Sequence, residues 1–330
     1  MDNQRLTDNY QRRLNYLRVS VTDRCNLRCI YCVPRDSIPR LLHTEILTYE
    51  EILRVIRVGA RMGITKIRVT GGEPLVRKGI TGFLSRVTQV PGIRDTSLTT
   101  NGVLLEDFAE DIRSAGISRI NVSLDSMERT RFRQITGKDR LRQVWKGLEK
   151  ALSLGFDPIK LNVVALSGFN DDELEAFARL TFEYPFHVRF IEYMPMGKTP
   201  LPSKRQLWGD DIRARVQTVG ELNALQPSAG DGPAEYYRFP GSRGKIGIIR
   251  PMTHHFCSSC NRLRLTASGQ IRPCLLTDIQ IDIRDVLRGS GDDTQIEKTL
   301  LKAVSAKPDG HHLNDENPGT VRDQMTAIGG

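Results

Sequence analysis

The six cysteines of the chain fall into two groups of three. The first cysteine group is Cys25, Cys29 and Cys32, and the second cysteine group is Cys257, Cys260 and Cys274. Thiols gathered in this way bind metals or carry out redox chemistry, and they do not resemble the disulfide framework of a small secreted domain. The sequence therefore predicts two metal sites with three thiolate ligands each.

The first cysteine group spans only eight residues, with three and then two residues between successive thiols. Three thiolates so close together can hold three corners of a cubane iron–sulfur cluster and leave one iron open. A structural zinc ion takes four ligands in a closed shell. Because no histidine lies near this motif, the spacing favours iron over the zinc alternative.

The second cysteine group brackets a predicted hairpin whose first strand carries Arg262 and Arg264. Two histidines, His254 and His255, directly precede the Phe-Cys pair at 256–257. A zinc ribbon that borrows a fourth ligand is therefore an open alternative to a second iron–sulfur cluster.

Elements of an α/β fold surround the first cysteine group. Short runs rich in Val, Ile and Leu predict six buried parallel strands, at residues 16–22, 66–70, 96–100, 119–124, 159–166 and 187–194. Amphipathic patterns between them predict helices that include residues 48–63, 103–116, 141–155 and 170–181. Asn170 and Glu173 have the spacing of a capping box at the start of the last of these helices.

Strands that alternate with helices predict right-handed βαβ units. Six such units indicate an incomplete (βα)6 barrel of the TIM type, open along one side. The first cysteine group follows the first strand, Gly-Gly-Glu-Pro at 71–74 follows the second, and Thr-Asn-Gly at 100–102 follows the third. All three motifs are therefore expected at one end of the barrel.

The pattern changes after residue 198. We expect a barrel domain over 1–198 and a smaller C-terminal α+β domain over 199–305, with short antiparallel strands near 235–239, 245–250, 263–266 and 270–272. Residues 306–330 are rich in Gly, Pro and polar side chains and are expected to form a flexible tail that ends in Gly329 and Gly330.

Charge and hydropathy narrow the class of protein. The net charge is +9 at pH 7, but no block of Lys and Arg interleaved with aromatic residues predicts nucleic-acid binding. No apolar run approaches the length of a membrane span, and the first residues lack the apolar core of a secretory signal. We therefore expect a cytoplasmic protein that binds neither nucleic acid nor membrane.

The run DRCNLRCIYCVP, at 23–34, resembles the cysteine motif of the radical S-adenosylmethionine (SAM) superfamily, including the aromatic Tyr31 before the third cysteine. In that superfamily the open iron binds the methionine part of SAM, and one electron from the cluster cleaves SAM to a 5′-deoxyadenosyl radical. The resemblance implies that Gly72 of the Gly-Gly-Glu-Pro motif, Ser123 and Met194 contact SAM, and that Tyr31 lies near its adenine.

The run PMTHHFCSSCNRLRLTASGQIRPCLL, at 251–276, resembles the second-cluster segment of the GTP 3′,8-cyclase family of molybdenum cofactor biosynthesis. The likeness extends over nearly the whole chain from about Asn15. It implies a second 4Fe–4S cluster on the second cysteine group, whose open iron binds guanine. It also implies a set of GTP contacts, namely Arg18, Arg68, Thr99, Lys160, Arg262, Leu263 and Arg264, of which Arg262 and Arg264 are catalytic together with the first cysteine group.

In that family the tail that ends in two glycines enters the active site, so Gly329 and Gly330 are implied there. The implied reaction is a lyase reaction that converts GTP to (8S)-3′,8-cyclo-7,8-dihydroguanosine 5′-triphosphate. It requires an external electron donor such as a flavodoxin and a later enzyme that forms the cyclic pyranopterin. The expected state is a monomer or a homodimer.

Two other functions remain alternatives. One is a two-cluster radical SAM enzyme that modifies a peptide, although such enzymes usually carry more C-terminal cysteines and lack the Arg262 and Arg264 pair. The other is a zinc-binding nucleic-acid module without catalysis. Metal analysis separates the second from the enzymes, because two cubane clusters contain about eight irons.

Overall fold

The computed structural model describes residues 6–32, 41–197, 201, 206–226, 232–311 and 321–329. The strands in these ranges are β1 (Tyr16–Ser20), β2 (Lys66–Thr70), β3 (Asp95–Thr100), β4 (Ile120–Ser123), β5 (Ile159–Ala165), β6 (His187–Glu192), β7 (Asn223–Ala224), β8 (Glu235–Arg238), β9 (Lys245–Ile249), β10 (Arg262–Leu265), β11 (Gln270–Arg272) and β12 (Ile281–Asp282). The helices are α1 (Tyr49–Arg61), α2 (Ile80–Thr88), α3 (Leu105–Ser114), α4 (Arg129–Thr136), α5 (Leu141–Ser153), α6 (Leu174–Glu183), α7 (Gly209–Gln217), α8 (Arg284–Arg288), α9 (Asp293–Ser305) and α10 (Met325–Ile328).

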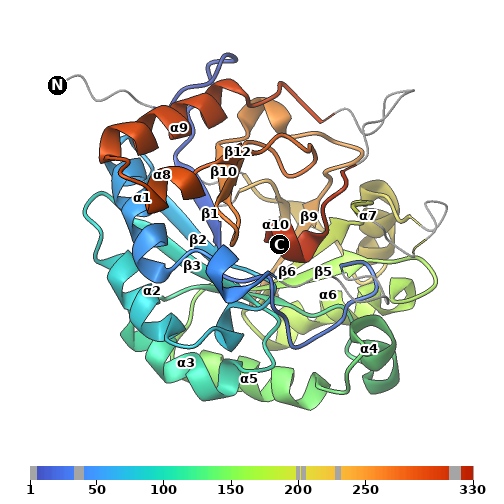
Figure 1. Ribbon diagram of the computed structural model, residues 1–330. Helices are drawn as coiled ribbons and strands as arrows, with labels where there is room; N and C mark the ends of the chain where they lie inside the picture. Colours follow the sequence, from blue (N-terminus) through green and yellow to red (C-terminus); the bar gives the residue numbers. More distant parts are fainter. Residues whose placement is uncertain are drawn as a thin grey trace.

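Strands β1 to β6 are parallel and lie side by side in chain order, as the sequence predicts. Helices α1, α2, α3, α5 and α6 cover the outside of the curved sheet (Figure 1). Alternate residues such as Leu17 and Val19 are fully buried, while Arg18 between them lines an internal cavity. This two-residue period packs apolar side chains against the helices and leaves polar ones for the interior. The strand order begins at β12 and ends at β7, so the barrel is incomplete, as predicted.

The C-terminal strands extend this sheet at both edges. Strand β9 pairs in parallel with β6, and β10 pairs in parallel with β1. Each is also one arm of an antiparallel hairpin, with β8 and β11 respectively. The sequence predicts the hairpins but not their parallel attachment, which satisfies the backbone groups that β1 and β6 would otherwise leave unpaired at the edges of the sheet. The domain limits at 198 and 305 stay a prediction.

The capping box predicted at Asn170 is wrong. The Asn170 amide donates to the carbonyls of Asp125 and Val164 at 2.7 and 2.9 Å and accepts from Leu166 N at 2.8 Å. Glu173 accepts from Ser126 Oγ at 2.8 Å. Helix α6 begins at Leu174 without a side-chain cap. Both polar side chains instead tie the loop after β5 to the loop after β4, because each is buried and finds hydrogen-bond partners there.

The structure describes residues 306–311 and 321–329 of the predicted tail, and residues 321–329 are packed against the rest of the chain. Val321 and Ile328 are buried against Met196 and Leu276. The buried Arg272 donates to the Asp323 carboxylate. Helix α10 lies in the middle of the ring of strands (Figure 1). Composition predicts a flexible tail because Gly and polar residues dominate it, but a few spaced apolar side chains are enough to dock it.

No helix within the described ranges combines the length and the apolarity that crossing a membrane requires.

Candidate active site

The first cysteine group lies in the loop that leaves β1, and neighbouring backbone holds this loop on two sides. Gly72 N donates to Thr22 O at 2.6 Å, and Glu73 N donates to Arg24 O at 2.8 Å. On the other side, Ile30 N donates to Ile135 O of α4 at 2.9 Å. The motifs at the ends of β1 and β2 therefore meet, as the strand order predicts.

The glycine at position 72 is required by this close approach. A Cβ atom there would lie 2.4 Å from the Arg24 carbonyl oxygen, well inside van der Waals contact. The contact of Gly72 with SAM stays a prediction. The structure gives the position a second reason to be glycine, because its backbone packs against the cysteine loop itself.

Glu73 is a buried carboxylate that fixes the end of β3. It accepts from Asn101 N at 2.6 Å, from Thr100 Oγ1 at 2.8 Å and from Leu75 N at 3.1 Å. Burial raises the pKa of Glu73 to about 7 despite these donors. Asn101 in turn donates to Asn26 Oδ1 at 2.6 Å and to Cys25 Sγ at 3.6 Å. The sequence identifies Thr-Asn-Gly only as a strand end, and the contact of Asn101 with the cysteine loop was missed.

The three thiols of the first group are set in surroundings that disfavour bare thiolates. Burial raises the pKa of Cys25 and Cys29, and it raises the pKa of Cys32 to about 12. A cationic iron centre that takes all three sulfurs would offset this cost, so the donor set fits an iron–sulfur cluster. The Tyr31 hydroxyl donates to Asp125 Oδ2 at 2.5 Å, which fixes the ring beside the loop.

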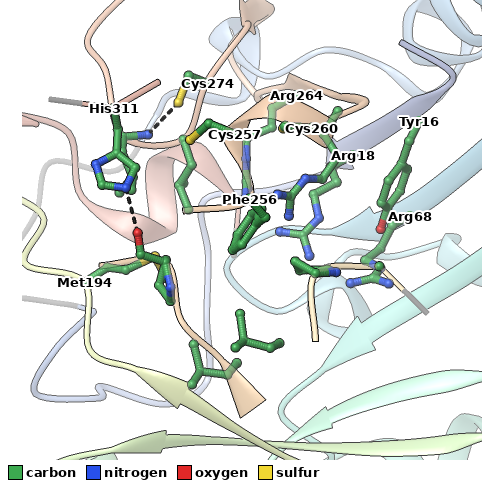
Figure 2. Close-up of a pocket in the computed structure, with 18 of the residues that line it drawn as sticks. Tyr16, Arg18, Arg68, Met194, Phe256, Cys257, Cys260, Arg264, Cys274 and His311 are labelled. Carbon is green, nitrogen blue, oxygen red and sulfur yellow. Dashed lines mark hydrogen bonds between the residues drawn. The ribbon is translucent and has the colours of Figure 1, made fainter. Parts of the chain in front are cut away.

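The second cysteine group lines a cavity together with Phe256, Met194 and His311 (Figure 2). Cys257 begins a short 3-10 helix (Cys257–Ser259), Cys260 precedes β10, and Cys274 follows β11. Burial opposes ionisation of Cys260, but the charges of Arg262 and Lys307 lower its pKa to about 6. This sulfur is therefore prepared for metal ligation.

In the zinc alternative, a histidine beside this group would supply the fourth ligand. His255 Nδ1 lies 2.9 Å from Pro251 O, and His311 Nε2 lies 2.6 Å from the same oxygen. The two rings meet edge to face, with 4.2 Å between their centroids. Across the described ranges, no three His, Cys, Asp or Glu side chains are arranged to hold a single metal ion.

A row of arginines crosses three neighbouring strands. Arg18 of β1 lies in register with Arg264 of β10 on one side and with Arg68 of β2 on the other. All three line the cavity (Figure 2). Because parallel strands in register present neighbouring residues on one face, the sheet itself brings these guanidinium groups together.

The cavity is strongly cationic. Its described lining contains six basic residues and no carboxylate: Arg18, Lys66, Arg68, Arg189, Arg262 and Arg264. Burial and the neighbouring cations lower the pKa of Arg18 to about 10 and the pKa of Arg264 further. Burial would raise the pKa of Tyr16, but Arg68, Arg18 and Lys66 lower it to about 8. Buried cations without carboxylates indicate a site for an anion of several charges.

Two further predicted contacts extend the polar interior. Lys160 of β5 is buried, and desolvation together with Arg189 and Arg68 lowers its pKa to about 7. The buried hydroxyl of Thr99 on β3 has no hydrogen-bond partner among the described residues, so it is available to a ligand.

Sequence reasoning missed Arg189 of β6. Its Nη2 donates to Asn121 Oδ1 at 2.7 Å and to Asn162 Oδ1 at 2.5 Å. The signal was present, since a charged residue between the apolar Val188 and Phe190 must face the interior of a barrel.

The positions of three other predicted contact residues do not by themselves identify a ligand. Ser123 ends β4 and is partly buried. Met194 follows β6 and lies beside the second cysteine group (Figure 2). The Leu263 side chain belongs to the hydrophobic core, so the predicted GTP contact could come only from its backbone. The roles of all three stay predictions.

The tail contacts both the row of arginines and the first cysteine group. The Gly329 carbonyl accepts from Arg264 Nη1, and the Thr326 backbone hydrogen-bonds to the Cys32 thiol. A Cβ on Gly329 would lie 2.7 Å from Ser20 Cβ, and its φ of 85° is one that glycine adopts without strain. Gly330 lies outside the described residues.

Two family models match the chain: "Radical SAM superfamily" over residues 19–181 and "Molybdenum Cofactor Synthesis C" over residues 186–313. The first implies SAM and an iron–sulfur cluster, which the first cysteine group fits. Among solved structures, SuiB of Streptococcus suis bound to S-adenosylmethionine aligns with a TM-score of 0.64 at 14% identity, covering 96% of this chain and 77% of that one. This likeness supports the fold alone.

Curated relatives match far more closely. The chain is 46% identical to the GTP 3′,8-cyclase of Thermodesulfovibrio yellowstonii over 329 residues, and 45% identical to that of Moorella thermoacetica over 325 residues. Each alignment covers 98% of this chain and 100% of the relative. Identity of this extent over both cysteine groups, the barrel and the C-terminal strands shows that the chain belongs to the GTP 3′,8-cyclase family.

Proposed function

We propose that this chain is a GTP 3′,8-cyclase that holds two 4Fe–4S clusters and uses SAM. The observation that carries the proposal is the cavity beside the second cysteine group, whose described lining contains six basic side chains and no carboxylate. A nucleoside triphosphate would supply negative charge to the five arginines of this lining, none of which forms an ion pair with a described carboxylate, and the family relatives bear the name of an enzyme that acts on GTP.

The row of Arg264, Arg18 and Arg68 would bind the triphosphate, because guanidinium groups offer paired donors to phosphate oxygens. Lys160 and the Thr99 hydroxyl would contact the nucleotide from the adjoining strands. A bound triphosphate would neutralise these cations and so remove the repulsion between their like charges. Binding energy of this kind can hold the ribose in a fixed position for reaction.

The first cysteine group would hold the cluster that binds and reduces SAM, and the second would hold a cluster near the guanine. When bound, SAM would supply a 5′-deoxyadenosyl radical, the chemistry needed to remove a hydrogen atom from the ribose. The chain's own contribution is placement and enclosure. Tail residues 325–329 contact both Arg264 and the Cys32 thiol, and they would exclude water from the reacting atoms.

Two partners belong to this proposal. The reaction consumes electrons, so an external reductant such as a flavodoxin is needed. The cyclised nucleotide is an intermediate, so a later enzyme that forms the cyclic pyranopterin is expected to take it.

The test is an anaerobic assay of the reconstituted protein with SAM, GTP and dithionite, read by mass spectrometry. We expect about eight irons per chain, 5′-deoxyadenosine, and a cyclised nucleotide with the mass of GTP. A Cys32→Ala variant is the control and should form neither product. If deoxyadenosine forms and GTP is unchanged, the substrate is wrong. Colourless protein that contains zinc would overturn the enzyme proposal.

A further inference from the structure

Lys307 is a buried cation that no sequence motif singles out. The residue is 4% exposed, and its Nζ donates to Arg262 O at 2.9 Å and to Pro273 O at 2.6 Å. Of the ion pairs formed among the described residues, none joins Lys307 to a carboxylate. A buried ammonium normally has a negative partner, so its partner has to be sought elsewhere.

The two acceptors of Lys307 mark the two ends of one hairpin. Arg262 follows Cys260 by two residues, and Pro273 directly precedes Cys274. One ammonium group therefore ties together the segments that carry two of the three thiols. It also hydrogen-bonds to the Cys260 thiol.

The third thiol is connected to the same segment through Arg12. Arg12 Nη1 donates to Cys257 O at 2.7 Å and to Asp309 O at 3.0 Å. Its Nε pairs with the buried Asp8 at 2.6 Å. The backbone just after Lys307 is thus fixed to the loop that carries Cys257, so Lys307 has a defined position relative to all three thiols.

We propose that Lys307 is a positioning residue of the second iron–sulfur cluster: it holds the Cys260 and Cys274 segments together and places a fixed positive charge beside the cluster, which raises its reduction potential. This inference rests on the proposed function only in that the second cysteine group holds a cluster. Hydrogen bonds and charge around ligand sulfurs are known to set both metal affinity and potential.

The test uses the full chain with the first cysteine group replaced by alanine, so that only the second cluster gives a signal. In this background we compare Lys307→Gln, Lys307→Met and Lys307→Arg with Lys302→Gln, which alters an exposed lysine of α9. Iron per chain and the midpoint potential from an EPR-monitored titration are measured. Circular dichroism of each variant checks that it folds.

Gln keeps donors for the two carbonyls but has no charge, so we expect iron binding close to that of the parent. Its potential should fall enough to change the ratio of reduced to oxidised cluster at least tenfold, which is about 59 mV for one electron. Lys307→Met removes both the donors and the charge. Its affinity for iron should also fall roughly 10- to 100-fold, as it does when other residues that hydrogen-bond metal ligands are replaced. Arg should restore the potential, and Lys302→Gln should leave both readouts unchanged.

An unchanged potential in Lys307→Gln overturns the inference, and the Gln variant decides even where Met fails to fold. A background chain that takes up no iron overturns the second cluster and the inference together. Failure of the wild-type chain to cyclise GTP overturns the proposed function alone, because the comparison of potentials does not depend on turnover.

Discussion

Replacing Lys160 with Met should stabilise the ligand-free protein and weaken its binding of GTP. Lys160 is buried on β5 among Arg189, Arg68 and Lys66, and its pKa is lowered from 10.5 to about 7, first by desolvation and then by these cations. A base whose pKa is depressed by folding makes the protein less stable as the pH falls from 10.5 to about 7. At about 1.4 kcal/mol per pKa unit, the cost below pH 7 approaches about 5 kcal/mol.

Lys160→Met removes this cost, but it also removes one favourable contact of the Lys160 side chain. The Lys160 ammonium lies 5.9 Å from the centre of the Tyr236 ring, a contact worth about 1 kcal/mol. We therefore expect Lys160→Met to raise the free energy of unfolding by roughly 1–3 kcal/mol at pH 7. Loss of one charged hydrogen bond to the triphosphate should raise the Kd for GTP roughly 10- to 100-fold.

The assay is denaturant unfolding of the ligand-free protein together with calorimetric titration of GTP at pH 7.5. Because a bound triphosphate raises the pKa of Lys160, wild-type protein should take up protons on binding, seen as a heat that depends on the buffer. Lys160→Met should take up fewer. The exposed Lys298→Met is the control and should behave as wild type. A variant that is less stable, or that takes up as many protons as wild type, would refute the reasoning.

Three more predictions use other contacts. Gly72→Ala should lose the first cluster and about half of the iron, because its Cβ would overlap the Arg24 carbonyl oxygen at 2.4 Å; unaltered iron content would contradict the packing argument. Arg12→Met should cost roughly 3–5 kcal/mol in urea unfolding because it strands the buried Asp8, and Asp8→Asn in the same chain should recover part of this. Tyr16, with a pKa of about 8, should ionise near pH 8 in ligand-free protein, and GTP should shift its 295 nm absorbance change to higher pH; the absence of such a shift would place the triphosphate elsewhere.

Local patterns in the sequence determined the six strands β1 to β6 and the two cysteine groups, and the family resemblance implied most of the cations of the site. The spacing of Cys25, Cys29 and Cys32 places three thiols on one loop regardless of what surrounds it. The two-residue alternation along each strand likewise separates inward from outward side chains. The family resemblance implied Arg18 and Arg68 as site residues, and the alternation along their strands is the physical reason that the structure places both in the cavity.

Only the tertiary structure decided how distant segments meet. Strand β10 joins the edge of β1, which puts Arg264 beside Arg18 although the two residues lie far apart in the chain. Lys307 and Arg12 reach the second cysteine group from opposite ends of the chain. No local pattern encodes such contacts, because they depend on which edges and surfaces are left to be covered once the barrel has formed.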